Sequence, residues 1–136
     1  MAKEKLFSNK YADTYYDASM KLFEIIWHSR VVPDEEYKNI YEKSLDQMES
    51  REFYTFLSDT RNEGVISPKA RKWFQEEAVQ RANKMGLRYA AVIINKEIFK
   101  KYYMNMILKW LNRKSEITMK IFYDYDEAIE WLKSFL

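Results

Sequence analysis

The residues whose types could do chemistry gather in one stretch, LSDTRNEGVISPKARKWF, at residues 57–74. Ser58, Asp59 and Arg61 follow an apolar run, and Ser67 stands at the start of a basic segment. Ligands of parallel α/β sheets bind beyond the carboxyl ends of the strands, where loops lead into helix N-termini. We therefore expect these four side chains to form a regulatory or anion-binding site.

Ser67 supports two interpretations. A serine followed by Pro68 is typical of a helix N-cap, which stabilises a helix by about 1 kcal/mol. A phosphoryl group on Ser67 would instead add about −1.5 to −2 charges beside the free backbone N–H groups of the helix start. Lys69, Arg71 and Lys72 are close enough in sequence to help hold such a group. The cap needs fewer assumptions, so the sequence favours it.

Several kinds of active site lack their residues in this chain. It has no cysteine and a single histidine, His28, which excludes thiolate sites and multi-histidine metal sites. Gly64 and Gly86 are the only glycines, so no glycine-rich phosphate loop can form. A receiver-type phosphorelay domain would need acidic residues at the end of an earlier strand, where the chain reads IIWHSR. We therefore expect no catalytic residues, no metal and no cofactor.

Length and charge narrow the class of protein. The chain has 136 residues and a formal net charge of +2. This length fits a single domain, residues 1–136, and the small net charge gives no general attraction to nucleic acid. The first ten residues, MAKEKLFSNK, lack the apolar core of a signal peptide, and no apolar run reaches membrane-spanning length. We expect a cytoplasmic protein.

Hydrophobic periodicity predicts five strands and four helices. The strands are expected within residues 11–19, 20–29, 53–59, 87–95 and 117–123, and the helices within residues 31–50, 67–86, 95–111 and 125–135. A short turn near Ser19 joins the first two strands as an antiparallel hairpin. The remaining strands alternate with helices, which is typical of a parallel sheet with right-handed crossovers. The predicted fold class is α/β, with a mainly parallel five-stranded sheet, an antiparallel N-terminal strand and four helices.

Helix boundaries are marked by capping residues. Ser67 and Asn95 are expected to cap the second and third helices. Gly86 is expected to end the second helix in a left-handed conformation. Asp124 and Glu127 have the spacing of a capping box for the last helix.

The third helix has more apolar surface than one buried stripe needs. Its candidate interaction residues are Phe99, Tyr102, Tyr103, Met106 and Trp110. Lys100, Lys101 and Lys109 are interspersed among them. The surplus could complete the core, line a pocket for a lipid or apolar ligand, contact a partner protein or second copy, or lie on a membrane surface.

The order of elements, together with several short motifs, resembles the STAS-like fold of the anti-sigma-factor-antagonist type, also called SpoIIAA-like. The motifs are IIW, PDEEY, LSDTR, RKWF, GLRYAAVI and the C-terminal FYDYDEAIEWLKSFL. The chain is most similar in pattern to the STAS/SEC14-like branch of small bacterial proteins. The resemblance implies a βα superhelix with sequential strands, helices mainly on one side, and a non-enzymatic regulatory or binding role.

The resemblance also bears on two candidate sites. Sigma-antagonist members carry a phosphorylated serine at the start of the second helix, and Ser67 is its counterpart by position. Ile66 and Pro68 stand where that pattern has an acidic residue and a glycine. In the SEC14-like comparison, an apolar ligand would lie between the sheet and the helices, near the third helix.

The sequence therefore predicts a non-catalytic, cytoplasmic binding or regulatory module. It would act on a partner protein, on a second copy of itself, or on a small apolar or anionic ligand such as a lipid, and not on nucleic acid. Two alternatives stay open. One is a small enzyme with its site on the strand-end loops around Asp59 and Arg61, and the other is a membrane-surface adaptor that uses the third helix.

Overall fold

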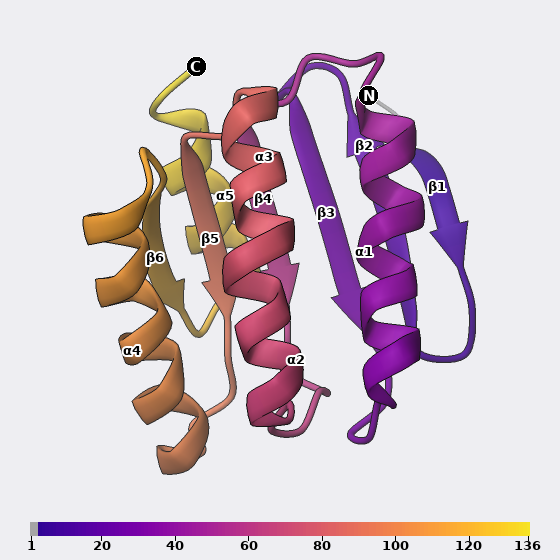
Figure 1. Ribbon diagram of the computed structural model, residues 1–136. Helices are drawn as coiled ribbons and strands as arrows, with labels where there is room; N and C mark the ends of the chain where they lie inside the picture. Colours follow the sequence, from indigo (N-terminus) through magenta and orange to yellow (C-terminus); the bar gives the residue numbers. More distant parts are fainter. Residues whose placement is uncertain (1–2) are drawn as a thin grey trace.

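A six-stranded sheet forms the centre of the molecule (Figure 1). The computed structural model describes residues 3–136, without the side chains of Ile98 and Phe99. The strands lie side by side in chain order: β1 Glu4–Ser8, β2 Ala12–Asp17, β3 Leu22–Trp27, β4 Thr55–Asp59, β5 Tyr89–Ile93 and β6 Thr118–Phe122. The first three are antiparallel neighbours, and β3 to β6 run parallel. The predicted α/β class and sequential strand order are confirmed.

The sheet has one strand more than the sequence predicted. The extra strand, β1, pairs antiparallel with β2 and ends the sheet on that side. Its sequence, EKLFS, is short and charged, and Leu6 is its one fully buried residue. Such a segment has little strand signal of its own. It becomes extended because the open edge of β2 offers unpaired backbone groups.

The helices are unequally divided between the two faces of the sheet. They are α1 Asp34–Met48, α2 Pro68–Trp73, a π-helical turn η1 Phe74–Ala78, α3 Val79–Met85, α4 Ile98–Lys114 and α5 Tyr125–Lys133. The segments α2, η1 and α3 form one continuous helix. We call the face covered by α1, α2–η1–α3 and α4 the front face, and α5 covers the back face (Figure 1). The expected placement of most helices on one side is therefore correct.

Two cores result from this arrangement. Side chains of a strand point alternately to its two faces. In β5, Ala90 and Val92 join the front core, whereas Ala91 and Ile93 join the back core under α5. The uninterrupted apolar run of this strand is explained by helices on both sides.

Most of the predicted helix ends are confirmed. The Ser67 hydroxyl accepts a hydrogen bond from the Ala70 backbone N–H at 3.0 Å, and Gly86 ends α3 with a φ of 117°. The Asp124 carboxylate accepts from the Glu127 backbone N–H, which begins α5. All of these signals act within a few residues, so the sequence alone was sufficient to show them.

The predicted cap at Asn95 is wrong. The N-cap of α4 is Glu97, two residues later, and no side chain caps that helix. Asn95 instead accepts from the Glu97 backbone N–H and donates to the Arg61 carbonyl, each at 3.0 Å. Asn95 therefore holds the turn before α4 to the loop after β4.

None of the helices within residues 3–136 has the length and apolar character that a membrane crossing requires.

Candidate functional site

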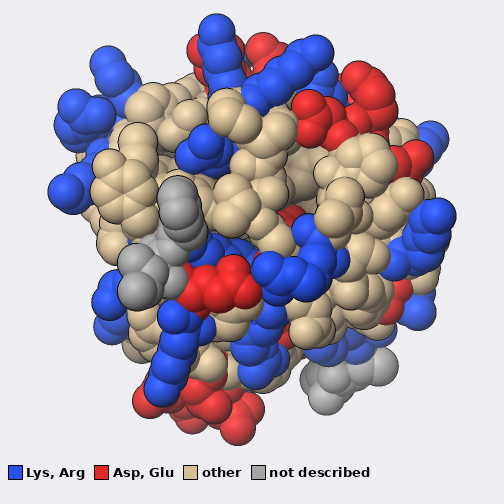
Figure 2. Space-filling view, turned by 90° about the horizontal axis from the view of Figure 1, so that it is seen from below, with Lys and Arg blue, Asp and Glu red and all other residues tan. Residues whose placement is uncertain are grey.

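One end of the molecule holds the carboxyl ends of β3 to β6. The N-termini of α1, α2, α4 and α5 lie at the same end (Figure 1). Figure 2 shows this end, where Lys and Arg side chains are spread over the surface and interrupted by Asp and Glu. It carries the loop 60–67, and the predicted anion site was expected here. The predicted residues lie near this end, but they point in different directions.

Ser58 and Asp59 are neighbours on β4 and therefore face opposite sides of the sheet. Ser58 is buried on the front face, where its hydroxyl accepts from the Trp27 indole N–H at 3.1 Å. The Asp59 carboxylate accepts from the Arg61 guanidinium, with Nε at 3.0 Å and Nη2 at 2.7 Å. This charge-assisted contact raises the pKa of Arg61 and uses both carboxylate oxygens. Asp59 and Arg61 are thus paired with each other.

Ser67 lies apart from both groups. Besides capping α2, its hydroxyl donates to the Asp34 carboxylate at 2.8 Å and so links the starts of α1 and α2. The structure therefore does not bring Ser58, the Asp59–Arg61 pair and Ser67 together in one pocket. Phosphorylation of Ser67 stays a prediction, and the adjacent Asp34 carboxylate would oppose the added negative charge.

The predicted interaction residues of α4 divide between two surfaces. Tyr103 is buried against the sheet, and Trp110 is half-buried beside the front core. Tyr102 and Met106 point outward, with exposed fractions of 65% and 52%. The side chain of Phe99 lies outside the described part of the structure. A partner protein, a second copy or a membrane at the outward face of α4 stays a prediction.

Lys100 is one of the lysines interspersed along the predicted third helix, and it does not lie on the surface. Its side chain is fully buried, and its ammonium donates to the backbone carbonyls of Thr60 and Glu63. Burial lowers the pKa of Lys100, although the Glu63 carboxyl and other acidic groups oppose that shift. The loop 60–63 folds over this lysine. Lys100 therefore anchors this loop to the start of α4.

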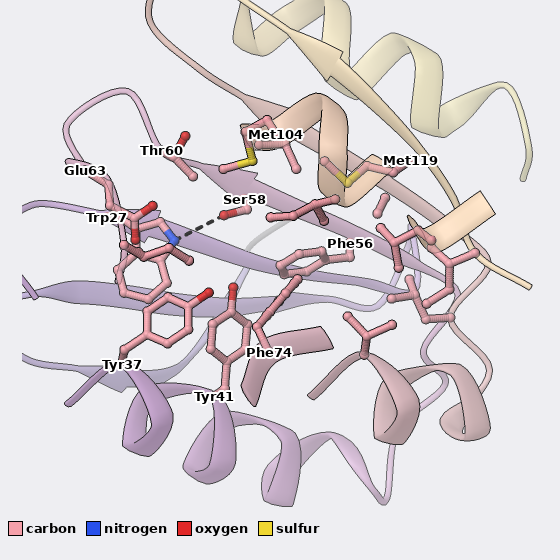
Figure 3. A pocket seen from close by; sticks show the side chains of 18 residues that line it. Trp27, Tyr37, Tyr41, Phe56, Ser58, Thr60, Glu63, Phe74, Met104 and Met119 are labelled. Atoms are coloured by element: carbon pink, nitrogen blue, oxygen red, sulfur yellow. Dashed lines mark hydrogen bonds between the residues drawn. The ribbon is translucent and has the colours of Figure 1, made fainter. Parts of the chain in front are cut away.

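A partly enclosed space lies between the sheet and the front helices (Figure 3). We call it the front cavity, and its volume is about 50 Å³. Its lining comes from β3, β4, β5 and β6 on the sheet side, and from α1, η1, α3 and α4 on the helix side. A second cavity of about 30 Å³ adjoins it and shares five lining residues, namely Tyr41, Phe56, Phe74, Val79 and Leu87. Both cavities lie on the front face of the sheet.

The walls of the front cavity are apolar and largely aromatic. Trp27 and Tyr37 are stacked with ring centroids 5.3 Å apart, and Tyr41 packs against Phe74 at 5.3 Å. The far wall is aliphatic and is formed by Met104, Ile107, Leu111, Ile117 and Met119, among others. The π-helical turn η1 begins at Phe74 and ends beside Val79, and both residues line the cavity. Such turns are frequent at functional sites because they displace one residue of a helix.

One end of the front cavity is polar. Ser58, Thr60 and Glu63 lie there, and the hydroxyls of Tyr37 and Tyr41 point from α1 toward Ser58 (Figure 3). The Thr60 hydroxyl is already used, since it donates to the Ile93 carbonyl at 2.8 Å. This end lies where β3 and β4 finish, which is the usual place for a ligand in a parallel sheet.

Glu63 is the unusual member of this polar end. Its side chain is only 3% exposed, and its Oε2 atom has no hydrogen-bond partner. Burial raises the pKa of Glu63 to about 8, and the nearby positive charge of Lys100 only partly opposes the shift. Glu63 also helps to raise the pKa of Tyr41, after burial itself. The cavity therefore contains an ionisable carboxyl group that the protein leaves unsatisfied.

Glu63 was not predicted as a site residue, because a glutamate in a polar turn normally faces water. A signal was present in the next residue, Gly64. A Cβ atom at Gly64 would lie 2.3 Å from the Arg30 carbonyl oxygen, so only glycine allows the loop to pack this closely. The inward direction of Glu63 then depends on Lys100, which is far away in sequence.

No group of three His, Asp or Glu side chains comes together as metal ligands in the part of the chain that the structure describes.

Comparison with known proteins fits this architecture. No curated protein matches the sequence. A similar crystal structure is that of an uncharacterised protein of the DUF3478 family, with a SpoIIAA-like fold, from Shewanella loihica PV-4. The TM-score is 0.59 at 16% identity, and the match covers 96% of this chain and 92% of that one. The resemblance to the SpoIIAA-like fold is therefore confirmed. Residues 22–136 match the family described as "Domain of unknown function (DUF7793)", and the chain belongs to that family.

Proposed function

We propose that this protein is a non-catalytic binding module whose ligand is a small molecule held in the front cavity. The observation that carries the proposal is the unpaired carboxylate oxygen of Glu63 at the end of an otherwise apolar cavity. Small-molecule sites are typically concave and apolar with a few polar groups that fix the orientation of the ligand. The SpoIIAA-like fold, which suggests a binding or regulatory module, supports the same conclusion.

The hydrogen-bond partners of the polar side chains favour binding over catalysis. The Ser58 hydroxyl accepts from the Trp27 indole N–H, and the Thr60 hydroxyl donates to the Ile93 carbonyl. Neither hydroxyl is therefore paired with a base, as a nucleophile would be. His28 is half-exposed elsewhere and contacts Asp13 at 3.0 Å. Asp59 and Arg61, the centre of the alternative enzyme prediction, are paired with each other. Within the described cavity lining, Glu63 supplies a carboxyl group whose Oε2 atom is unpaired.

The size of the cavity limits the ligand. A single water needs about 10–15 Å³ measured in this way, so about 50 Å³ admits several waters or a small organic molecule. A long acyl chain does not fit this space. The proposed ligand is therefore compact, and a lipid would have to displace the surrounding helices.

Native mass spectrometry of protein purified from its own cells tests the proposal. Val92 lines the front cavity, and Val92→Phe would fill part of it at a cost of about 1–3 kcal/mol in stability. Val31 is 79% exposed, so Val31→Phe is the matched control. We expect a small molecule to be retained by the parent and by Val31→Phe, and to be lost from Val92→Phe. Equal retention by all three proteins would contradict a site in this cavity.

A further inference from the structure

We propose that the ligand of the front cavity is a small neutral molecule with an apolar ring and one hydroxyl or amide group, which the carboxyl of Glu63 recognises. This inference rests on the proposed function and adds the chemical class of the ligand. Three features of the cavity carry it: the shape of its walls, the unpaired oxygen, and the balance of charge around that oxygen.

The walls favour a ring. Trp27, Tyr37, Tyr41, Phe56 and Phe74 all line the front cavity, so five aromatic side chains surround a small space. Aromatic rings pack well against other rings in offset or edge-to-face arrangements, which stabilise a complex beyond the burial of area alone. A compact ring uses these surfaces better than a flexible chain does.

The polar end of the front cavity contains a Glu63 oxygen that lacks a hydrogen bond. A buried carboxyl oxygen without a partner is unfavourable, because it has lost its hydration and has gained no hydrogen bond in return. The neighbouring hydroxyls of Ser58 and Thr60 are engaged with Trp27 and Ile93 and do not relieve Glu63. A ligand hydroxyl or amide beside Oε2 would provide the missing bond. Placed there, it would leave the ring of the ligand among the aromatic walls.

The charges around Glu63 disfavour ionic ligands. Lys100 lies buried behind the loop and donates to the backbone carbonyls of Thr60 and Glu63. A cationic ligand would add a second positive charge near Lys100, and an anionic ligand would lose its hydration in an apolar cavity while the Lys100 ammonium is already engaged by these carbonyls. Buried charge without a partner is strongly unfavourable. Burial raises the pKa of Glu63 to about 8, so near pH 7 a neutral carboxyl can both donate to and accept from a neutral ligand.

Four probes of similar shape test the inference by isothermal titration calorimetry at pH 7. They are phenol, toluene, benzylammonium and benzoate. We expect the parent protein to bind phenol about tenfold more tightly than toluene, which corresponds to one hydrogen bond. We expect both charged probes to bind more weakly than phenol. A parent that does not prefer phenol over toluene, or that binds a charged probe most tightly, would overturn the inference.

Two variants assign the preference to Glu63. Glu63→Leu should bind phenol and toluene equally, because the hydrogen-bonding group is lost and the apolar walls remain. Glu63→Gln should keep the preference, and Glu42→Leu, a change at an exposed glutamate on α1, should leave it unaltered. A preference that persists in Glu63→Leu would contradict the assignment. If the parent binds neither phenol nor toluene, the proposed function fails as well, whereas toluene binding without a phenol preference removes only this inference.

Discussion

At the scale of single residues, the proposed binding site depends on the separation of two buried ionisable groups, the Glu63 carboxyl and the Lys100 ammonium. Glu63 and Lys100 are close enough to influence each other, but the ammonium donates to backbone carbonyls and not to the carboxylate. Burial shifts both groups toward their neutral forms, since the pKa of Glu63 is raised and that of Lys100 is lowered. A direct ion pair would shift both groups the other way. The Glu63 carboxyl is consequently available to a ligand.

The raised pKa of Glu63 predicts how stability depends on pH. The unfolded chain loses the Glu63 proton near pH 4.5, and the folded protein keeps it until about pH 8. Between these values the folded state binds more protons, so the free energy of unfolding falls as pH rises, and the loss is complete above pH 8. We expect Glu63→Gln to remove this fall, and to be more stable than the parent by roughly 4 kcal/mol at pH 8.5 but not at pH 4.5.

Urea unfolding of the parent and of Glu63→Gln at a series of pH values checks this expectation. The difference between the two proteins isolates Glu63 from the other titrating groups. Glu42→Gln, at an exposed position, is the control and should follow the parent. A stability difference that does not change between pH 4.5 and 8.5 would mean that Glu63 is not buried in an unpaired state.

At the scale of secondary-structure elements, the front cavity depends on how the loop 60–66 is held against α4. Lys100 lies in the first turn of α4 and binds two carbonyls of that loop, and Asn95 binds a third at Arg61. Gly64 lets the same loop approach the Arg30 backbone, to whose carbonyl its N–H donates at 3.0 Å. These contacts turn a polar loop inward and place Glu63 in the cavity.

Lys100→Met tests this anchoring role. The substitution keeps an unbranched side chain of similar length but leaves the Thr60 and Glu63 carbonyls without their donor. We expect a loss of roughly 2–4 kcal/mol in stability and faster amide hydrogen exchange in residues 60–66. Lys101→Met changes the adjacent, exposed lysine and should do neither. Normal exchange protection of the loop in Lys100→Met would show that Lys100 does not hold it.

The contrast between helix caps and this loop explains what the sequence could predict. Ser67, Gly86 and Asp124 act on backbone groups within a few residues, so their roles were readable from local order. Glu63 and Lys100 are buried because the loop that carries Glu63 packs against the start of α4, which carries Lys100. The loop and the helix are separated along the chain, and neither glutamate nor lysine suggests burial by itself. The strand β1 was missed for a similar reason, because the edge of β2 and not its own pattern makes it extended.

At the scale of the whole molecule, the two faces of the sheet are built for different roles. The back face is covered by α5 alone, and Glu24 beneath it is satisfied by Lys3 at 2.7 Å and by the Tyr125 hydroxyl at 2.8 Å. The front face carries more helices but encloses two cavities and an unsatisfied carboxyl. A buried glutamate thus serves the fold on one face and remains unpaired on the other. We infer that binding is the role of the front face.

The most direct test of this claim uses the methionine methyl groups as reporters. Met104 and Met119 line the front cavity, Met20 lies in the back core, and Met106 is exposed on α4. The parent protein, labelled with ¹³C at its methionine methyls, would be titrated with toluene and followed by NMR. If the front cavity binds toluene, the methyl signals of Met104 and Met119 should show saturable shifts, with Met20 and Met106 unchanged. No saturable shift at Met104 and Met119, or larger shifts at Met20 or Met106, would contradict this claim.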